Sequence, residues 1–158
     1  MSDVSSIPRG LRSAHLFDLE LTPGTPHVLS RGGTTVRTVV PIAGGRFRGP
    51  RLLGQVVRGD DWLSYGDDGI HRLSVRLVLE TDGGDIVLMR YTGIRCGPAD
   101  VMQRLAAGEP VDPNAYYLRI APEFETTAAS CAWLNGIVAV GVGARMPDRV
   151  YYVVHEVL

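Results

Sequence analysis

The chain has 158 residues, of which 45% are hydrophobic and 21% are charged, and its formal net charge at pH 7 is −1. These values are typical of one globular domain with a buried core. They give no reason to expect nucleic acid or an anionic membrane as a partner, and no apolar run is long enough to cross a bilayer.

The first part of the chain is expected to lead into a single domain. The segment MSDVSSIPRGLRS lacks the apolar core of a signal peptide, so we expect a cytoplasmic protein. Residues 1–13 are expected to be flexible, and residues 14–158 to form the domain. Its first strand is predicted in HLFDLELTP (15–23). A turn at Arg31-Gly32-Gly33 then leads into TTVRTVVPIAGG, which is rich in β-branched residues, as strands are.

The middle and end of the chain continue this pattern, with one interruption. Short strands punctuated by Gly and Pro are followed by a hairpin over residues 70–95, which turns at residues 81–84 (TDGG). GPADVMQRLAAG is predicted to be a helix, with Pro98 where a helix can begin and Gly108 where it can end. NAYYLRIAPEFET is another strand, and a closing hairpin turns at Met146-Pro147-Asp148.

This succession predicts the fold class. About eight to ten strands with one helix, and no alternation of strands and helices, disfavour a parallel α/β sheet. The simplest architecture is all-β: a closed antiparallel β-barrel with one short helix plugging or flanking an end. Closure would also remove exposed sheet edges, which promote aggregation.

The sequence contains no familiar metal or nucleotide motif. The four histidines are scattered, and Cys96 and Cys131 have no metal-type spacing, so we expect no metal. The glycine clusters lack the GxGxxG pattern before a helix, so we expect no nucleotide cofactor. All 16 basic residues are arginine, so a given arginine is weaker evidence for anion binding than it would be in a chain that also used lysine.

The faces of the hairpin 70–95 leave two interpretations open. On its first strand, Arg72, Ser74 and Arg76 share one face, and the more apolar face carries leucines. Either the arginines face water and the leucines fill the barrel, or the leucines pack outward and the arginines line a lumen. Periodicity alone favours the first interpretation.

Several stretches resemble the DUF3237 (UPF0311) family. They are GGRFRGP, ETDGG, the PNAYYLR run with its following FET, and AWLN, and the likeness extends from about Leu16 onward. The resemblance implies a closed antiparallel barrel like that of lipocalins or allene oxide cyclase. Family members are mostly uncharacterised, but some occur in biosynthetic or catabolic gene neighbourhoods, as in bacterial secondary metabolism.

The resemblance shifts the preferred orientation of the arginines. Where the family usually reads LDARYTL, this chain reads LSVRLVL, which keeps Arg76 and has Ser74 in place of Asp. A preference for polar residues at these positions is expected of a lumen. We therefore predict that Arg76 points inward, although a carboxylate base used by relatives at position 74 would be absent here.

Candidate catalytic residues follow from this prediction. Arg76 could stabilise an enolate oxygen, Tyr117 could donate a proton, Arg119 could orient the substrate, and Glu125 could be a general base. Against this, an Arg–Glu surface pair is common and contributes little. Trp133 could instead close the barrel end, and Asn135 could form a turn. The candidate substrate-binding residues are Ser74, Arg90 or Tyr91 (which lie on opposite faces), Trp133 and Asn135.

The sequence thus predicts a cofactor-independent enzyme acting on a small molecule in the barrel lumen. The expected reaction is that of an isomerase, cyclase, hydratase or lyase next to a carbonyl, with a carbonyl- or carboxylate-bearing substrate. The alternative is a non-catalytic barrel that binds a small ligand. A homodimer is possible if the leucine face points outward.

Overall fold

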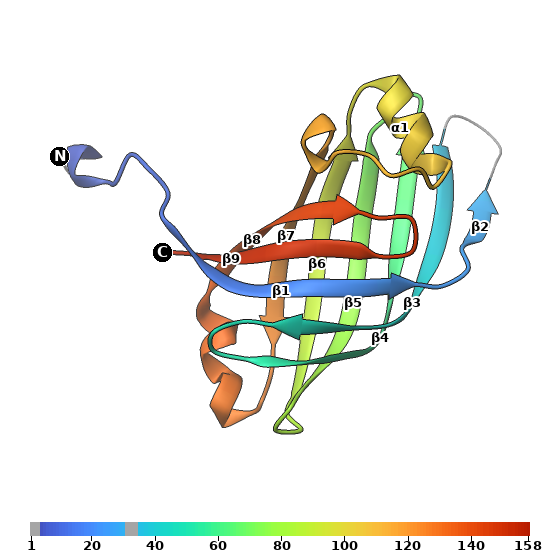
Figure 1. The fold of residues 1–158 in the computed structure, drawn as a ribbon. Helices are drawn as coiled ribbons and strands as arrows, with labels where there is room; N and C mark the ends of the chain where they lie inside the picture. The colour runs from blue at the N-terminus through green and yellow to red at the C-terminus, as the bar shows by residue number, and fades with distance from the viewer. Residues whose placement is uncertain (1–3, 31–34) are drawn as a thin grey trace.

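The computed structural model describes residues 4–30 and 35–158, which are mainly β-strands (Figure 1). The helical segments are α1 (Ala99–Ala106) and the 3-10 segments Val4–Ser6, Pro113–Ala115 and Ala129–Gly136. The predicted turn at Arg31-Gly32-Gly33 lies outside the described residues. The strands are β1 (Ser13–Pro23), β2 (His27–Ser30), β3 (Thr35–Arg48), β4 (Leu53–Gly66), β5 (His71–Thr81), β6 (Ile86–Cys96), β7 (Tyr117–Glu125), β8 (Val138–Arg145) and β9 (Val150–Val157).

The strands close into a ring. Hydrogen-bonded neighbours follow the order β1-β9-β8-β7-β6-β5-β4-β3-β2, and β1 also pairs with β3. That pairing, which places Asp18 opposite Arg48 and Leu19 opposite Phe47, joins the two ends of the sheet. The fold is a closed antiparallel β-barrel of eight strands with one short helix, as predicted, and β2 pairs with β3 beside the ring.

Turn residues explain where the elements end. The β5–β6 turn contains Gly84 at φ +84°, and the Thr81 N–H donates to the Asp85 carbonyl at 2.9 Å. Gly108, at φ +75°, follows α1 in the left-handed conformation that glycine adopts without strain. The Met146 N–H donates to the Arg149 carbonyl at 2.8 Å and closes the β8–β9 hairpin. Both hairpin turns and the helix lie where the sequence predicts them.

The orientation of β5 corrects the prediction for Arg76. Leu73, Val75, Leu77 and Leu79 are buried, while Arg76 is exposed on the outer wall. The prediction that its guanidinium enters the lumen is therefore wrong. Burying each apolar side chain stabilises the fold by roughly 1.5–3 kcal/mol, whereas turning the strand over would expose those side chains and bury unpaired guanidinium groups at large cost. The leucine face therefore forms no outward dimer surface.

The interior is packed differently at its two ends. Near the β5–β6 turn, Phe17 contacts Phe47 and Phe124, with ring centroids 5.6 and 6.0 Å apart. The other end lies beside α1 and the β8–β9 turn, where β1, β8 and β9 cross in front of β5 and β6 in Figure 1.

Among the described residues, no helix combines the length and apolar character needed to span a membrane.

Candidate functional site

The end of the barrel beside the β8–β9 turn contains a hollow of about 360 Å³, which we call the lumen pocket. A volume of this size is sufficient for a small organic molecule. Its apolar wall includes Leu21, Ile42, Leu63, Leu73 and Val150. Its polar wall includes Asp61, Tyr91, Arg95, Arg145 and Tyr152, which come from β4, β6, β8 and β9.

Asp61 reaches the lumen because β4 alternates its side chains between the two faces. The neighbouring Asp60 accepts a hydrogen bond from the indole of Trp62 at 2.9 Å, in an exposed contact. Asp61 pairs with Val75 across the ladder, and its Oδ1 accepts the Ser74 N–H at 3.3 Å. This carboxyl is thus anchored to the backbone of β5 while it faces the lumen pocket.

The environment of Asp61 favours its protonated form. Burial raises the pKa of Asp61 to about 6, and the Asp60 carboxylate contributes a smaller rise. The Ser74 N–H and the Arg95 charge oppose this rise in the pKa but do not cancel it. A carboxyl with such a pKa can both donate and accept a proton near neutral pH.

Two buried tyrosines lie on the wall of the lumen pocket. The rings of Tyr91 and Tyr152 meet edge to face, with centroids 5.6 Å apart. Burial raises the pKa of both phenols above the ordinary tyrosine value, and the nearby Asp61 charge raises both further. Both hydroxyls are therefore neutral hydrogen-bond donors at physiological pH.

Arg95 and His71 form a contact at the same end of the barrel. The Arg95 guanidinium donates to His71 Nδ1 at 3.0 Å, and the His71 ring stacks on Tyr65 at 4.4 Å. Burial, together with the charges of Arg95 and Arg145, lowers the pKa of His71 to about 4. His71 is thus neutral at pH 7, so its Nδ1 is the acceptor.

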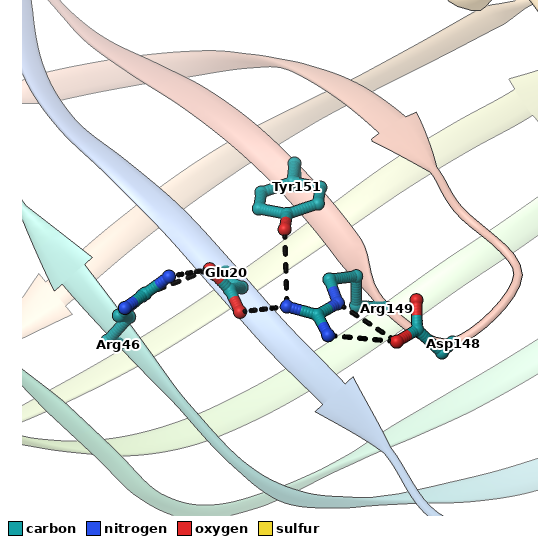
Figure 2. A network of polar contacts seen from close by, with 5 residues as sticks. All are labelled: Glu20, Arg46, Asp148, Arg149 and Tyr151. Atoms are coloured by element: carbon teal, nitrogen blue, oxygen red, sulfur yellow. Dashed lines mark hydrogen bonds and ion pairs between the residues drawn. The ribbon is translucent and has the colours of Figure 1, made fainter.

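A polar network fixes the β8–β9 turn at the rim of the lumen pocket (Figure 2). Glu20 on β1 accepts hydrogen bonds from Arg149 at 2.8 Å and from Arg46 on β3 at 2.9 Å. Arg149 also donates to Asp148 at 2.9 Å and to the Tyr151 hydroxyl at 3.4 Å. The turn is thereby tied to both strands that close the ring.

The structure brings several of the predicted site residues together, but outside the barrel. An outer groove of about 750 Å³ is lined by Arg76, Arg90, Glu125 and Asn135, among others. Ser74 lies in a smaller outer hollow that Arg76 and Arg90 also line. Arg90 donates to Glu123 at 2.7 Å in an exposed contact between β6 and β7.

The groove does not include Tyr91, Tyr117, Arg119 or Trp133. Arg119 stacks over the ring of Tyr117 at 4.8 Å on the outer face of β7. Trp133 is covered by the guanidinium of Arg51 at 3.4 Å. Asn135 exchanges two hydrogen bonds of 2.9 Å with the backbone of Thr126 and so holds a turn. Tyr91 is the predicted site residue that lines the lumen pocket.

Sequence reasoning missed Asp61, Arg95, Arg145 and Tyr152. A signal was available for Arg95, which shares a strand face with Tyr91, and for the Asp60-Asp61 pair, because adjacent strand residues face opposite sides. The outer groove is larger than the lumen pocket, yet its arginines and carboxylates are mostly solvent-exposed. Electrostatic interactions are stronger in the buried pocket, which we therefore take as the candidate site.

Known proteins resemble this chain closely over nearly its whole length. A UPF0311 protein of Rhodopseudomonas palustris is 36% identical over 149 residues, covering 94% of this chain and 97% of the relative. The crystal structure of a conserved R. palustris protein of unknown function has a TM-score of 0.89 at 35% identity, covering 96% of this chain and 100% of its own. A beta-barrel like protein from Acinetobacter baumannii has a TM-score of 0.83 at 31% identity, covering 97% and 99%.

A more distant relative has a described activity. A hydroalkoxylation enzyme of Penicillium herquei is 23% identical over 133 residues, covering 84% of this chain and 74% of the enzyme. The crystal structure of an enzyme from that organism has a TM-score of 0.73 at 20% identity, covering 97% of this chain and 98% of its own, and shares the fold.

The family described as protein of unknown function (DUF3237) matches residues 11–157. This chain therefore belongs to the DUF3237 (UPF0311) family, as its sequence motifs predict.

Proposed function

We propose that this protein is an enzyme that moves protons within one small molecule held in the lumen pocket, with Asp61 as the acid–base group. The observation that carries the proposal is a buried carboxyl, with a pKa of about 6, facing a hollow of about 360 Å³. Acid–base groups of enzymes work best when their pKa lies near the operating pH. Perturbed carboxyls inside clefts are accordingly enriched at active sites.

The reaction class is addition of a hydroxyl across a carbon–carbon double bond beside a carbonyl, or the reverse elimination. In the addition, a hydroxyl oxygen of the same molecule forms a bond to one alkene carbon and releases its proton. The other alkene carbon gains a proton, so the product is an isomer of the substrate and no oxidant or reductant is consumed. Asp61 can deliver one proton and recover the other, which leaves it unchanged after each turnover.

The neighbouring tyrosines suit the same chemistry. As the addition begins, negative charge develops on the carbonyl oxygen of the substrate. Neutral Tyr152, which accepts a hydrogen bond from Tyr91, can donate its own hydrogen bond to that oxygen from the buried wall of the pocket. The distant similarity to a hydroalkoxylation enzyme supports this reaction class, because hydroalkoxylation is itself the addition of a hydroxyl to an alkene.

The test compares variants on a panel of hydroxy-enones that cyclise by this addition, such as 2′-hydroxychalcone, whose loss is followed by absorbance. We expect Asp61→Asn to lower kcat by at least about 100-fold while circular dichroism shows an intact barrel. Retained turnover in that variant would refute the role of Asp61. If Arg76→Leu abolishes turnover and Asp61→Asn does not, the active site is the outer groove.

A non-catalytic ligand-binding barrel is the second candidate, and the apolar wall of the lumen pocket favours it. This candidate is tested by mass spectrometry of the purified protein. A ligand that co-purifies, and that stays chemically unchanged on prolonged incubation, supports the carrier. It would also count against the enzyme if the whole hydroxy-enone panel is left unconverted.

A further inference from the structure

We infer that the lumen pocket binds a molecule with an anionic oxygen group, a carboxylate or an ionised phenol or enol, which lies against the guanidinium of Arg95. The inference uses the location given by the proposed function and adds the chemical class of the molecule bound there. It rests on the hydrogen bonds that Arg95 leaves unmade, on the balance of charge in the pocket and on the apolar wall.

Arg95 is a buried arginine with few partners. The residue is 8% exposed, and its guanidinium makes one hydrogen bond to the described side chains, with neutral His71 at 3.0 Å. Its Nε is buried and has no hydrogen-bond partner in the described part of the chain. A guanidinium has five N–H donors in a planar fork, so this pocket-lining group has donors that no described residue uses.

No carboxylate of the described chain forms an ion pair with Arg95, although the Asp61 charge acts on it at longer range. None lies within 4.0 Å of the Arg95 guanidinium, although the pocket also contains Asp61. A buried guanidinium without an ion-pair partner is destabilising, and a bidentate anion is the partner whose geometry matches the fork. An anionic ligand would thus satisfy a group that the protein itself leaves unsatisfied.

The other charged groups at the pocket also favour an anionic ligand. Arg145 lines the lumen pocket, and its side chain makes no hydrogen bond or ion pair to another described residue. Asp148, at the rim, is already paired with Arg149 at 2.9 Å. The unpaired charge facing the pocket is therefore positive, apart from the titratable Asp61.

The apolar wall defines the rest of the ligand. Leu21, Leu63 and Leu73 would contact a hydrocarbon or aromatic body, and the volume of about 360 Å³ limits its size. A compact aromatic or unsaturated acid, or an acidic phenol, combines both features. Such a molecule can also carry the alkene and oxygen on which the proposed reaction would act.

The test uses matched probes that differ in charge. Binding of trans-cinnamate and of its neutral counterpart cinnamamide is measured by calorimetry at pH 7. We expect the wild-type protein to bind cinnamate at least tenfold more tightly, and Arg95→Gln to abolish that preference with little effect on cinnamamide. Arg48→Gln, an exposed substitution on the outer face of β3, is the matched control and should leave both affinities unchanged.

A second probe keeps the inference falsifiable if Arg95→Gln fails to fold. 4-Nitrophenol absorbs visible light when it is ionised, so a phenolate bound beside Arg95 should appear at a lower pH than in free solution. Binding of cinnamate alone assigns the site to carboxylates, and a shift of 4-nitrophenol alone assigns it to phenolates. Equal affinities for cinnamate and cinnamamide in the wild-type protein, without a shift of 4-nitrophenol, would overturn the inference.

The two proposals can fail separately. If Asp61→Asn keeps turnover while Arg95→Gln loses cinnamate, the acid–base role of Asp61 fails and the anion site stands. If Asp61→Asn loses turnover while the wild-type protein binds cinnamate and cinnamamide equally, the anion site is refuted and the proposed enzyme activity is supported.

Discussion

Asp61 and His71 contribute opposite pH dependences to stability. The folded-state pKa of Asp61, about 6, is above its ordinary value of 3.8, so the fold loses stability as pH rises between these values. The folded-state pKa of His71, about 4, is below its ordinary value of 6.5, so the fold loses stability as pH falls between those values. The two effects oppose each other over nearly the same pH range.

Separating the two residues should reveal this compensation. Asp61→Asn should increase the free energy of unfolding at pH 8 by up to about 3 kcal/mol, because a pKa shift of about two units has been removed. At pH 3.5 the same variant should match the wild-type protein. Urea denaturation at both pH values is the measurement, and equal effects at both would contradict the buried-carboxyl explanation.

His71 provides the matched control for this experiment. With Asp61→Asn as background, stability should fall steeply on acidification from pH 6.5 to pH 4, since His71 then acts alone. Adding His71→Gln should flatten the profile. A profile that stays steep in the double variant would assign the acid sensitivity to other groups.

At the scale of elements, the β8–β9 turn depends on Glu20 for its position at the pocket rim. Glu20→Gln should weaken both arginine contacts and lower the affinity for a ligand in the lumen pocket about fivefold, equivalent to about 1 kcal/mol. The rate of turnover of bound substrate should change little, because Glu20 does not face the pocket. The dissociation constant of trans-cinnamate is the readout.

A control of similar chemistry exists at the end of α1. Glu109 pairs with the exposed Arg104 at 2.9 Å, away from the lumen pocket. Glu109→Gln should leave the affinity unchanged. If both variants weaken binding equally, the network has no specific role in positioning the turn.

The elements themselves follow from local sequence, but one orientation does not. The strand, turn and helix signals around Gly84 and Gly108 were sufficient, because they depend on backbone preferences of neighbouring residues. On β5 the leucine face indicated the right orientation, yet the polar preference at Ser74 and Arg76 led to the wrong one. Polar residues on an outer wall can be retained for solubility or for pairing, so they do not identify a lumen.

Most residues of the candidate site could not be predicted from local sequence patterns. Asp61, Arg95 and Tyr152 lie on three strands, and their meeting depends on the registers of the whole ring. Alternation along β6 predicts that Tyr91 and Arg95 share one face, and the sequence of a single strand predicts nothing more about the site. The strands that lie opposite this face are determined only when the barrel closes.

In the whole barrel, the aromatic cluster at one end of the interior stabilises the fold, and the lumen pocket at the other end is the proposed binding site. Phe17→Ala, in the packed end, should lower the free energy of unfolding by about 3–5 kcal/mol while the affinity for trans-cinnamate stays within about twofold. Val153→Ala, on the outer face of β9, is the control and should change stability by less than about 0.5 kcal/mol. A large loss of affinity in Phe17→Ala would show that the two ends are coupled.

The pairing of β1 with both β3 and β9 bears on how the molecule is made. A chain leaving the ribosome can assemble the neighbouring ladders from β3 to β6 while later residues are still being synthesised. Arg145 and Tyr152 arrive only with β8 and β9, whose pairing with β1 completes the ring. The lumen pocket is thus completed last, and an intermediate without β8 and β9 has the apolar wall exposed to water while Asp61 and Arg95 are already in place.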